Sequence, residues 1–165
     1  MKNLQALAAQ CRAELASIGI FCGKVNRWTV NTRAKTRWGL CRKLTDGSFE
    51  IEISVMLLQD SVSDRAAKET IIHELLHTVP GCNGHTGKWK LLAALVNQKL
   101  PMYQIKRTTS AEEKGLQNVR KTQSYRYLLR CGSCGKNIQR QKKSAVVEHP
   151  ERYRCTCGGR LIRIR

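Results

Sequence analysis

The spacing of apolar residues predicts three helices in the first 100 residues. Apolar side chains recur at helical spacing over residues 4–18 with polar ones between them, as in an amphipathic helix. A second helix is predicted over residues 61–79, capped by Ser61 or Ser63 and stopped by the Pro-Gly pair that follows. A third spans about residues 86–100, and its apolar stripe consists of Trp89, Leu92, Ala93, Val96 and Leu100.

Between the first two helices the pattern changes to the two-residue period of strands. The segments RWTVN, TRWGLCRKL and SFEIEIS are predicted strands, and Thr45-Asp46-Gly47 between the last two is typical of a hairpin turn. One face of the last strand carries Phe49, Ile51 and Ile53, and the other carries Glu50 and Glu52. We therefore expect a short antiparallel sheet among the helices.

The composition changes after residue 105. Residues 106–122 contain little that could be buried, which predicts a linker. Residues 123–165 combine short predicted strands, glycines and paired cysteines. The sequence thus predicts an α+β domain over residues 1–105 and a β-rich module over residues 123–165.

The charge of the chain is unusually positive. Its 165 residues carry a formal net charge of +18, and residues 104–165 hold 16 basic and 4 acidic residues. Such a field attracts polyanions, so we expect DNA as a partner, although a merely solvated basic surface is the alternative. No apolar run is long enough to cross a bilayer and no signal peptide is evident, so we expect a cytoplasmic monomer without a membrane partner.

Three of the four histidines lie close together in the segment HELLHTVPGCNGH. His73 and His77 are four residues apart, about 40° around a helix and roughly 6 Å along it, so both rings can reach one ion. Glu74 lies about 100° away and can contact a metal-held water instead. The alternative is a polar helix with solvent-facing histidines.

His85 is the expected third ligand. Pro80, Gly81 and Gly84 let the chain leave the helix and turn back. His85 also lies four residues before Trp89, in phase with the buried stripe of the next helix. Three histidines and one open position are typical of a catalytic zinc, for which Glu74 would be the general base.

These motifs resemble the SprT-like (Spartan-like) zinc metalloproteases. The resemblance rests on HELLH, on GHTGKW after it and on NTRAKTRWGLC upstream, and it covers about residues 1–105 before continuing into a C-terminal zinc ribbon. It implies a small zincin-type metalloprotease domain with one catalytic zinc. It also implies a link to DNA, since relatives degrade proteins crosslinked to DNA.

The eight cysteines fall into two groups. Four are isolated and are expected to be core residues: Cys11, Cys22, Cys41 and Cys82. The other four, Cys131, Cys134, Cys155 and Cys157, form two close pairs followed by glycine, which predicts a structural zinc. Because the second pair has only one residue between its cysteines, His149 is an alternative fourth ligand, and a redox CxxC pair is the alternative function.

Basic residues and tyrosines surround these cysteine pairs. Basic side chains pair with phosphates and tyrosines stack on bases, so we expect sequence-tolerant DNA binding. The candidate DNA contacts are Arg126, Arg130, Lys136, Arg140, Lys142, Lys143, Arg152, Arg154, Arg160 and Arg163.

The sequence therefore predicts a zinc endopeptidase that acts on DNA-associated or DNA-crosslinked proteins. The hairpin strand over residues 37–44 is the candidate docking edge for a substrate peptide, and an ordinary core hairpin is the alternative. Arg37 and Tyr103 are the candidates for stabilising the oxyanion, and the sequence does not choose between them. The alternatives are a non-catalytic nucleic-acid-binding zinc protein and a general peptidase whose charge is incidental.

Overall fold

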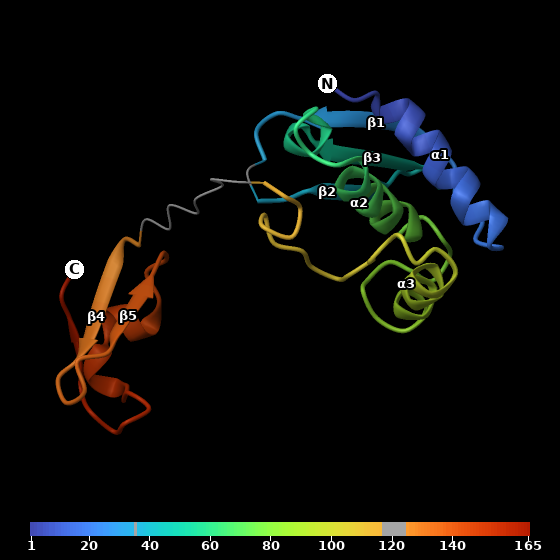
Figure 1. Ribbon diagram of the computed structural model, residues 1–165. Helices are drawn as coiled ribbons and strands as arrows, with labels where there is room; N and C mark the ends of the chain where they lie inside the picture. Colours follow the sequence, from blue (N-terminus) through green and yellow to red (C-terminus); the bar gives the residue numbers. More distant parts are fainter. Residues whose placement is uncertain (35, 117–124) are drawn as a thin grey trace. The chain divides into compact units, whose positions relative to one another are not determined.

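The computed structural model describes residues 1–34, 36–116 and 125–165 (Figure 1). The chain divides into two compact units, residues 1–119 and residues 120–165. Each unit is described by itself below.

Three helices of the first unit lie where the apolar spacing predicts them. They are α1 (Leu4–Ser17), α2 (Asp64–Leu76) and α3 (Lys88–Lys99). The Ser63 side chain accepts a hydrogen bond from the N–H of Ala66, so Ser63 and not Ser61 caps α2. α2 ends at Leu76, earlier than predicted, and the chain leaves it through a tight turn in which the N–H of His77 donates to the carbonyl of Glu74.

The sheet of this unit is mixed, not wholly antiparallel as predicted. Its strands are β1 (Val25–Asn31), β2 (Gly39–Lys43) and β3 (Phe49–Ser54), in the order β1-β3-β2. β2 and β3 form the predicted hairpin, whereas β1 pairs parallel with the other edge of β3. β3 is the strand with fully buried Ile51 and Ile53, and its central place lets it pair on both sides.

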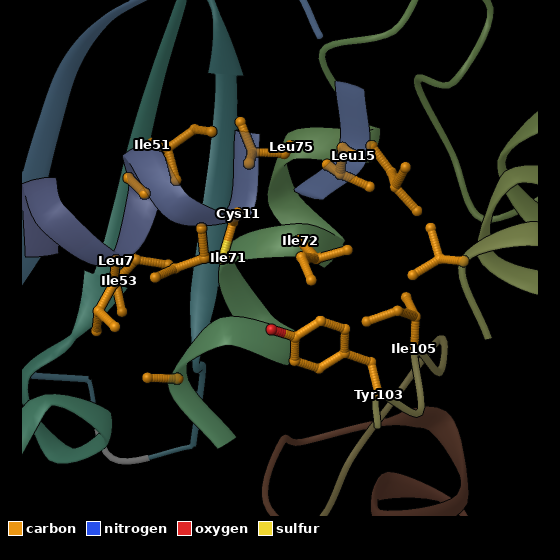
Figure 2. Packing of buried hydrophobic residues seen from close by; sticks show 14 of the residues in the cluster. Leu7, Cys11, Leu15, Ile51, Ile53, Ile71, Ile72, Leu75, Tyr103 and Ile105 are labelled. Atoms are coloured by element: carbon orange, nitrogen blue, oxygen red, sulfur yellow. The ribbon is translucent and has the colours of Figure 1, made fainter. Parts of the chain in front are cut away.

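The core of the first unit lies between the helices and the sheet. Side chains of α1, β3 and α2 meet there, together with Tyr103 and Ile105 from the segment after α3 (Figure 2). A short 3₁₀ turn, η1 (Val55–Leu58), connects β3 to the loop before α2 and adds two buried leucines. This packing holds α2 rigidly behind β2, which is what positions the site.

The first part of the expected linker packs against this unit. The Lys114 side chain is only 3% exposed and donates to the carbonyl of Ala66 in α2. The indole N–H of Trp38 donates to the carbonyl of Thr109. Residues 106–116 are therefore part of the first unit, and the rest of the predicted linker, residues 117–122, lies outside the described residues.

The second unit is a small antiparallel sheet with two short turns of helix. Its strands are β4 (Tyr127–Cys131), β5 (Asn137–Arg140) and β6 (Leu161–Arg163), in the order β5-β4-β6. The helical turns are α4 (Ala145–Glu148) and η2 (Pro150–Arg152). The buried residues of its core are Leu129, Cys131, Val147, Cys155 and Leu161. Within the described part of the chain, none of the helices is long and apolar enough to cross a membrane.

Candidate metal centre

The fold brings the three predicted histidines together. His73 lies in the last turn of α2, His77 at its end, and His85 in the loop before α3. The Nε2 atom of His85 is 2.8 Å from that of His73 and 3.1 Å from that of His77. Three nitrogens bound to one tetrahedral zinc at 2.0–2.1 Å would be roughly 3.3 Å apart, so the spacing fits zinc.

Backbone carbonyls orient two of the rings. The Nδ1–H of His73 donates to the carbonyl of Lys106 at 2.9 Å, and that of His77 donates to the carbonyl of Cys82 at 2.8 Å. A proton on Nδ1 leaves the Nε2 lone pair free, so the lone pairs of both rings point to a common centre. Burial, then the neighbouring imidazoles His77 and His85, lower the pKa of His73 to about 4, which keeps the ring in the neutral form that binds metal.

Trp89 of α3 forms the floor of the histidine group. Its indole is only 2% exposed, and its ring centroid lies 4.7–5.6 Å from those of the three imidazoles. This contact explains why His85 is in phase with the buried stripe of α3, and it limits the directions in which the rings can turn.

Glu74 lies beside the histidines and against β2. Its side chain is 7% exposed, and burial raises the pKa of its carboxyl to about 7, although the N–H of Cys41 and the charge of Arg37 oppose this shift. A Cβ atom at Gly39 would lie 2.5 Å from Oε1 of Glu74, so only glycine leaves room for the carboxylate there. The sequence alone did not identify Gly39 as a residue of the site. The one feature that could have pointed to it is its place in the RWGLC segment.

The site opens on both sides of Glu74 along β2. A cavity of about 250 Å³ on one side is lined by residues 36–39, Gln104 and residues 106–109, together with His73 and Glu74. A second of about 460 Å³ is lined by Leu40, Cys41, Lys43, Phe49, His77 and His85, and both share Gly39. A chain laid along β2 would pass over the histidine group.

The two oxyanion candidates differ in access. Tyr103 is buried, and its hydroxyl donates to Glu14 at 2.7 Å, so it faces the core and not the site. Arg37 lines the smaller cavity, with one guanidinium nitrogen 2.6 Å from Glu52. Of the two, only Arg37 lies where a substrate could reach it.

The second unit brings its four cysteines together. The Sγ atoms of Cys131 and Cys157 are 3.5 Å apart and those of Cys134 and Cys155 are 3.7 Å apart. Four sulfurs around one zinc at about 2.3 Å would be roughly 3.8 Å apart, so this group also fits zinc. Backbone N–H groups lower the pKa of Cys131 and Cys155, whereas the neighbouring thiols raise the pKa of Cys134. The first two cysteines therefore favour the thiolate that a metal requires.

The remaining histidine and cysteines lie outside the two groups of potential ligands. His149 is exposed and lies 3.5 Å from a carboxylate oxygen of Glu151, so the four cysteines form the group without it. The isolated cysteines Cys11, Cys22, Cys41 and Cys82 lie in or against the core of the first unit, as expected. Burial raises the pKa of Cys11 and of Cys41 to about 12.

All ten predicted DNA contacts of the second unit are exposed. Some are partly engaged within the unit: Lys143 pairs with Glu148 at 2.9 Å, and the guanidinium of Arg163 lies 5.1 Å from the ring centroid of Tyr127. These basic side chains lie on several elements of the second unit.

The fold and the two sites define a class of protein. Its members have an α+β domain with a three-histidine group that could hold zinc, followed by a module with a four-cysteine group. The sequence model of the SprT-like family matches residues 15–114, and the chain belongs to this family. It therefore carries a metalloprotease-like domain, and the matched range includes both the histidine group and residues 106–114. No curated protein and no solved structure matches the chain.

Proposed function

We propose that the protein is a zinc-dependent endopeptidase that acts on DNA-associated or DNA-crosslinked proteins. The observation that carries this proposal is the Glu74 carboxylate beside three converging Nε2 atoms, in a site open along β2. Family membership supports the protease chemistry, and the basic second unit supports the link to DNA.

The chain's own residues have defined tasks in peptide hydrolysis. Zinc held by His73, His77 and His85 would supply Lewis-acid chemistry, by acidifying water and polarising the peptide carbonyl. Glu74 accepts the proton of the attacking water and then donates it to the leaving nitrogen. The N–H of Cys41 lowers the pKa of the Glu74 carboxyl against the effect of burial, which favours the carboxylate that accepts this proton.

β2 supplies an open edge for a substrate backbone. The N–H of Leu44 donates to the carbonyl of Ser48 in the hairpin, and alternate residues of an antiparallel strand face opposite ways. The contact between the N–H of Cys41 and Glu74 agrees with this alternation. The backbone groups that point away from β3 therefore belong to Gly39, Cys41 and Lys43. A peptide added at this edge would place its scissile bond beside Glu74.

The second unit would bring this activity to DNA. Its exposed arginines and lysines can neutralise phosphates without reading bases, so binding should be sequence-tolerant and weakened by salt. The cysteines are all free thiols, which favours a reducing compartment such as the cytoplasm.

Glu74→Gln tests the proposal directly. The amide cannot accept a proton, so cleavage of a DNA-crosslinked protein should fall about 10²–10⁴-fold while zinc stays bound. Asp60→Asn, which makes the same carboxylate-to-amide change in an exposed loop, should cleave at the wild-type rate. The assay compares all three proteins with and without DNA, at low and high salt.

Each outcome has a distinct meaning. Wild-type cleavage by Glu74→Gln would refute the mechanism. DNA binding without cleavage by any of the proteins would favour the non-catalytic nucleic-acid-binding alternative. A cleavage rate that is the same with and without DNA would favour a general peptidase.

A further inference from the structure

The segment over residues 103–116, here called the strap, forms part of the metal centre. After α3 it returns across α2 and presents the carbonyl of Lys106 to the Nδ1–H of His73 at 2.9 Å. It also lines the smaller cavity beside Glu74. A polar segment can aim one carbonyl at a metal ligand only if something else holds its backbone in place.

Asn97 of α3 holds the strap next to that carbonyl. The N–H of Ile105 donates to Oδ1 of Asn97 at 2.6 Å, and Nδ2 of Asn97 donates to the carbonyl of Ile105 at 3.1 Å. The Ile105 side chain is 4% exposed in the core (Figure 2). Both backbone groups of the residue before Lys106 are thus bound by one side chain, which fixes the peptide that leads into Lys106 and so limits where the Lys106 carbonyl can point.

Three further contacts hold the strap against α2. The N–H of Gln104 donates to Oε1 of Glu69 at 2.9 Å. The ammonium of Lys114 donates to the carbonyl of Ala66 at 3.1 Å and lies 3.3 Å from Oε2 of Glu69. Glu69 precedes His73 by one helical turn, so the strap is clamped on the face of α2 that carries this histidine.

From this geometry we infer that Asn97 is a positioning residue of the three-histidine centre. It acts through the backbone of Ile105 and Lys106 on the orientation and tautomer of His73. Groups that orient a metal ligand in this way typically contribute about 10–100-fold to metal affinity. The inference rests on the zinc site of the proposed function, but it concerns metal binding and not peptide cleavage.

The test is the zinc affinity of the full chain carrying Asn97→Ala. Competition with a chelator should show one of the two zinc ions held about 10–100-fold more weakly than in the wild type. The other, at the four cysteines, should be unchanged and is the internal reference. Cobalt substitution adds a spectroscopic readout. Cobalt held by the histidines has no thiolate ligand and absorbs differently from cobalt held by the cysteines, so the histidine site can be followed by itself.

Two variants on the same helix separate positioning from general destabilisation. Gln98→Ala removes the exposed neighbour of Asn97 and should change neither zinc affinity. Val96→Ala opens a hole in the core and should lower the unfolding midpoint, while zinc affinity at the histidines stays within about twofold of the wild type.

Equal zinc affinity in the wild type and Asn97→Ala would overturn the inference, as would an equal loss in Val96→Ala. A wild-type protein that binds both ions but cleaves nothing would instead count against the proposed function and leave the role of Asn97 intact.

Discussion

The three-histidine and four-cysteine groups differ in how the chain holds them. Two of the histidines lie at the end of helix α2 and the third in the loop before α3, beside a large core. The carbonyls of Lys106 and Cys82 orient two of the rings, and Trp89 packs beneath all three. The cysteines lie at the end of β4 and in the loops around a core of five buried residues, two of which are Cys131 and Cys155 themselves. The first group is held by packing, whereas the second has little besides its ligands to hold it.

This difference predicts opposite roles for the two metals. A unit of this small size buries too little apolar surface to fold firmly, so zinc would stabilise the second unit itself. The first unit has its core without metal, so zinc there would add chemistry and leave the fold unchanged. Four thiolates also fill a tetrahedral site, while three imidazoles leave one position open for reaction.

The largest expected effect is unfolding of the second unit when one of its four cysteines is replaced. Cys134→Ser changes an exposed thiol and should unfold the second unit, because structural zinc contributes on the order of 10–16 kcal/mol of apparent binding free energy. Amide dispersion in NMR spectra should collapse for residues 125–165, and bound zinc should fall from two ions to one. Cys22→Ser in the first unit should leave both unchanged.

A second effect, large for activity but small for stability, is expected from His85→Ala. This variant should lose the zinc of the first unit and at least about 10³-fold of the cleavage rate. Its circular dichroism and urea midpoint should stay close to those of the metal-free wild type. Cooperative unfolding of the first unit on loss of this ion would show that zinc stabilises the fold of this unit as well, contrary to the difference described above.

Gly39→Ala should have an intermediate effect. The new Cβ would overlap Glu74 and move its carboxylate, and a displacement of about 1 Å at a reacting group can reduce a rate on the order of 10²-fold. Zinc content should be unchanged, because Glu74 is not one of the three ligands. A wild-type kcat in this variant would show that the position of Glu74 is not critical.

The smallest effect is expected for single basic residues of the second unit. Arg140→Gln should weaken DNA binding and lower the slope of log K against log salt by about 0.9, as for one lost phosphate contact. Arg27→Gln removes a 71% exposed arginine of the first unit and should leave that slope unchanged. Equal effects of the two would mean that DNA binding is spread over both units.

Local patterns in the sequence predicted much of the fold and many residues of the metal centre. The four-residue spacing of His73 and His77 places both rings on one helical face, and the Asp-Gly turn predicts the β2–β3 hairpin. For the histidine pair and the hairpin the interacting residues are close in the chain, so period and turn chemistry suffice. The spacing of the cysteines likewise predicts two close pairs. The contacts that complete the four-cysteine group join Cys131 to Cys157 and Cys134 to Cys155, which are distant in the chain, so they depend on the fold of the second unit.

Other features had no local signal. Residues 106–116 are polar, and composition alone predicted a linker, yet the pairing of Lys114 with Glu69 and the carbonyl of Ala66 lets the segment pack. The parallel pairing of β1 was missed because either edge of a strand accepts a partner in either direction.

The amino-acid sequence by itself determined which residues could bind metal, because imidazole, thiolate and carboxylate chemistry belongs to the side chains and their spacing. Only the tertiary structure decided which groups orient them. The carbonyls of Lys106 and Cys82 and the N–H of Cys41 are backbone groups that almost any residue type could supply. The space at Gly39 requires glycine, but only because the fold packs Glu74 against this residue. The positions of these groups depend on how distant segments pack, and that packing is not written in any short stretch of the chain.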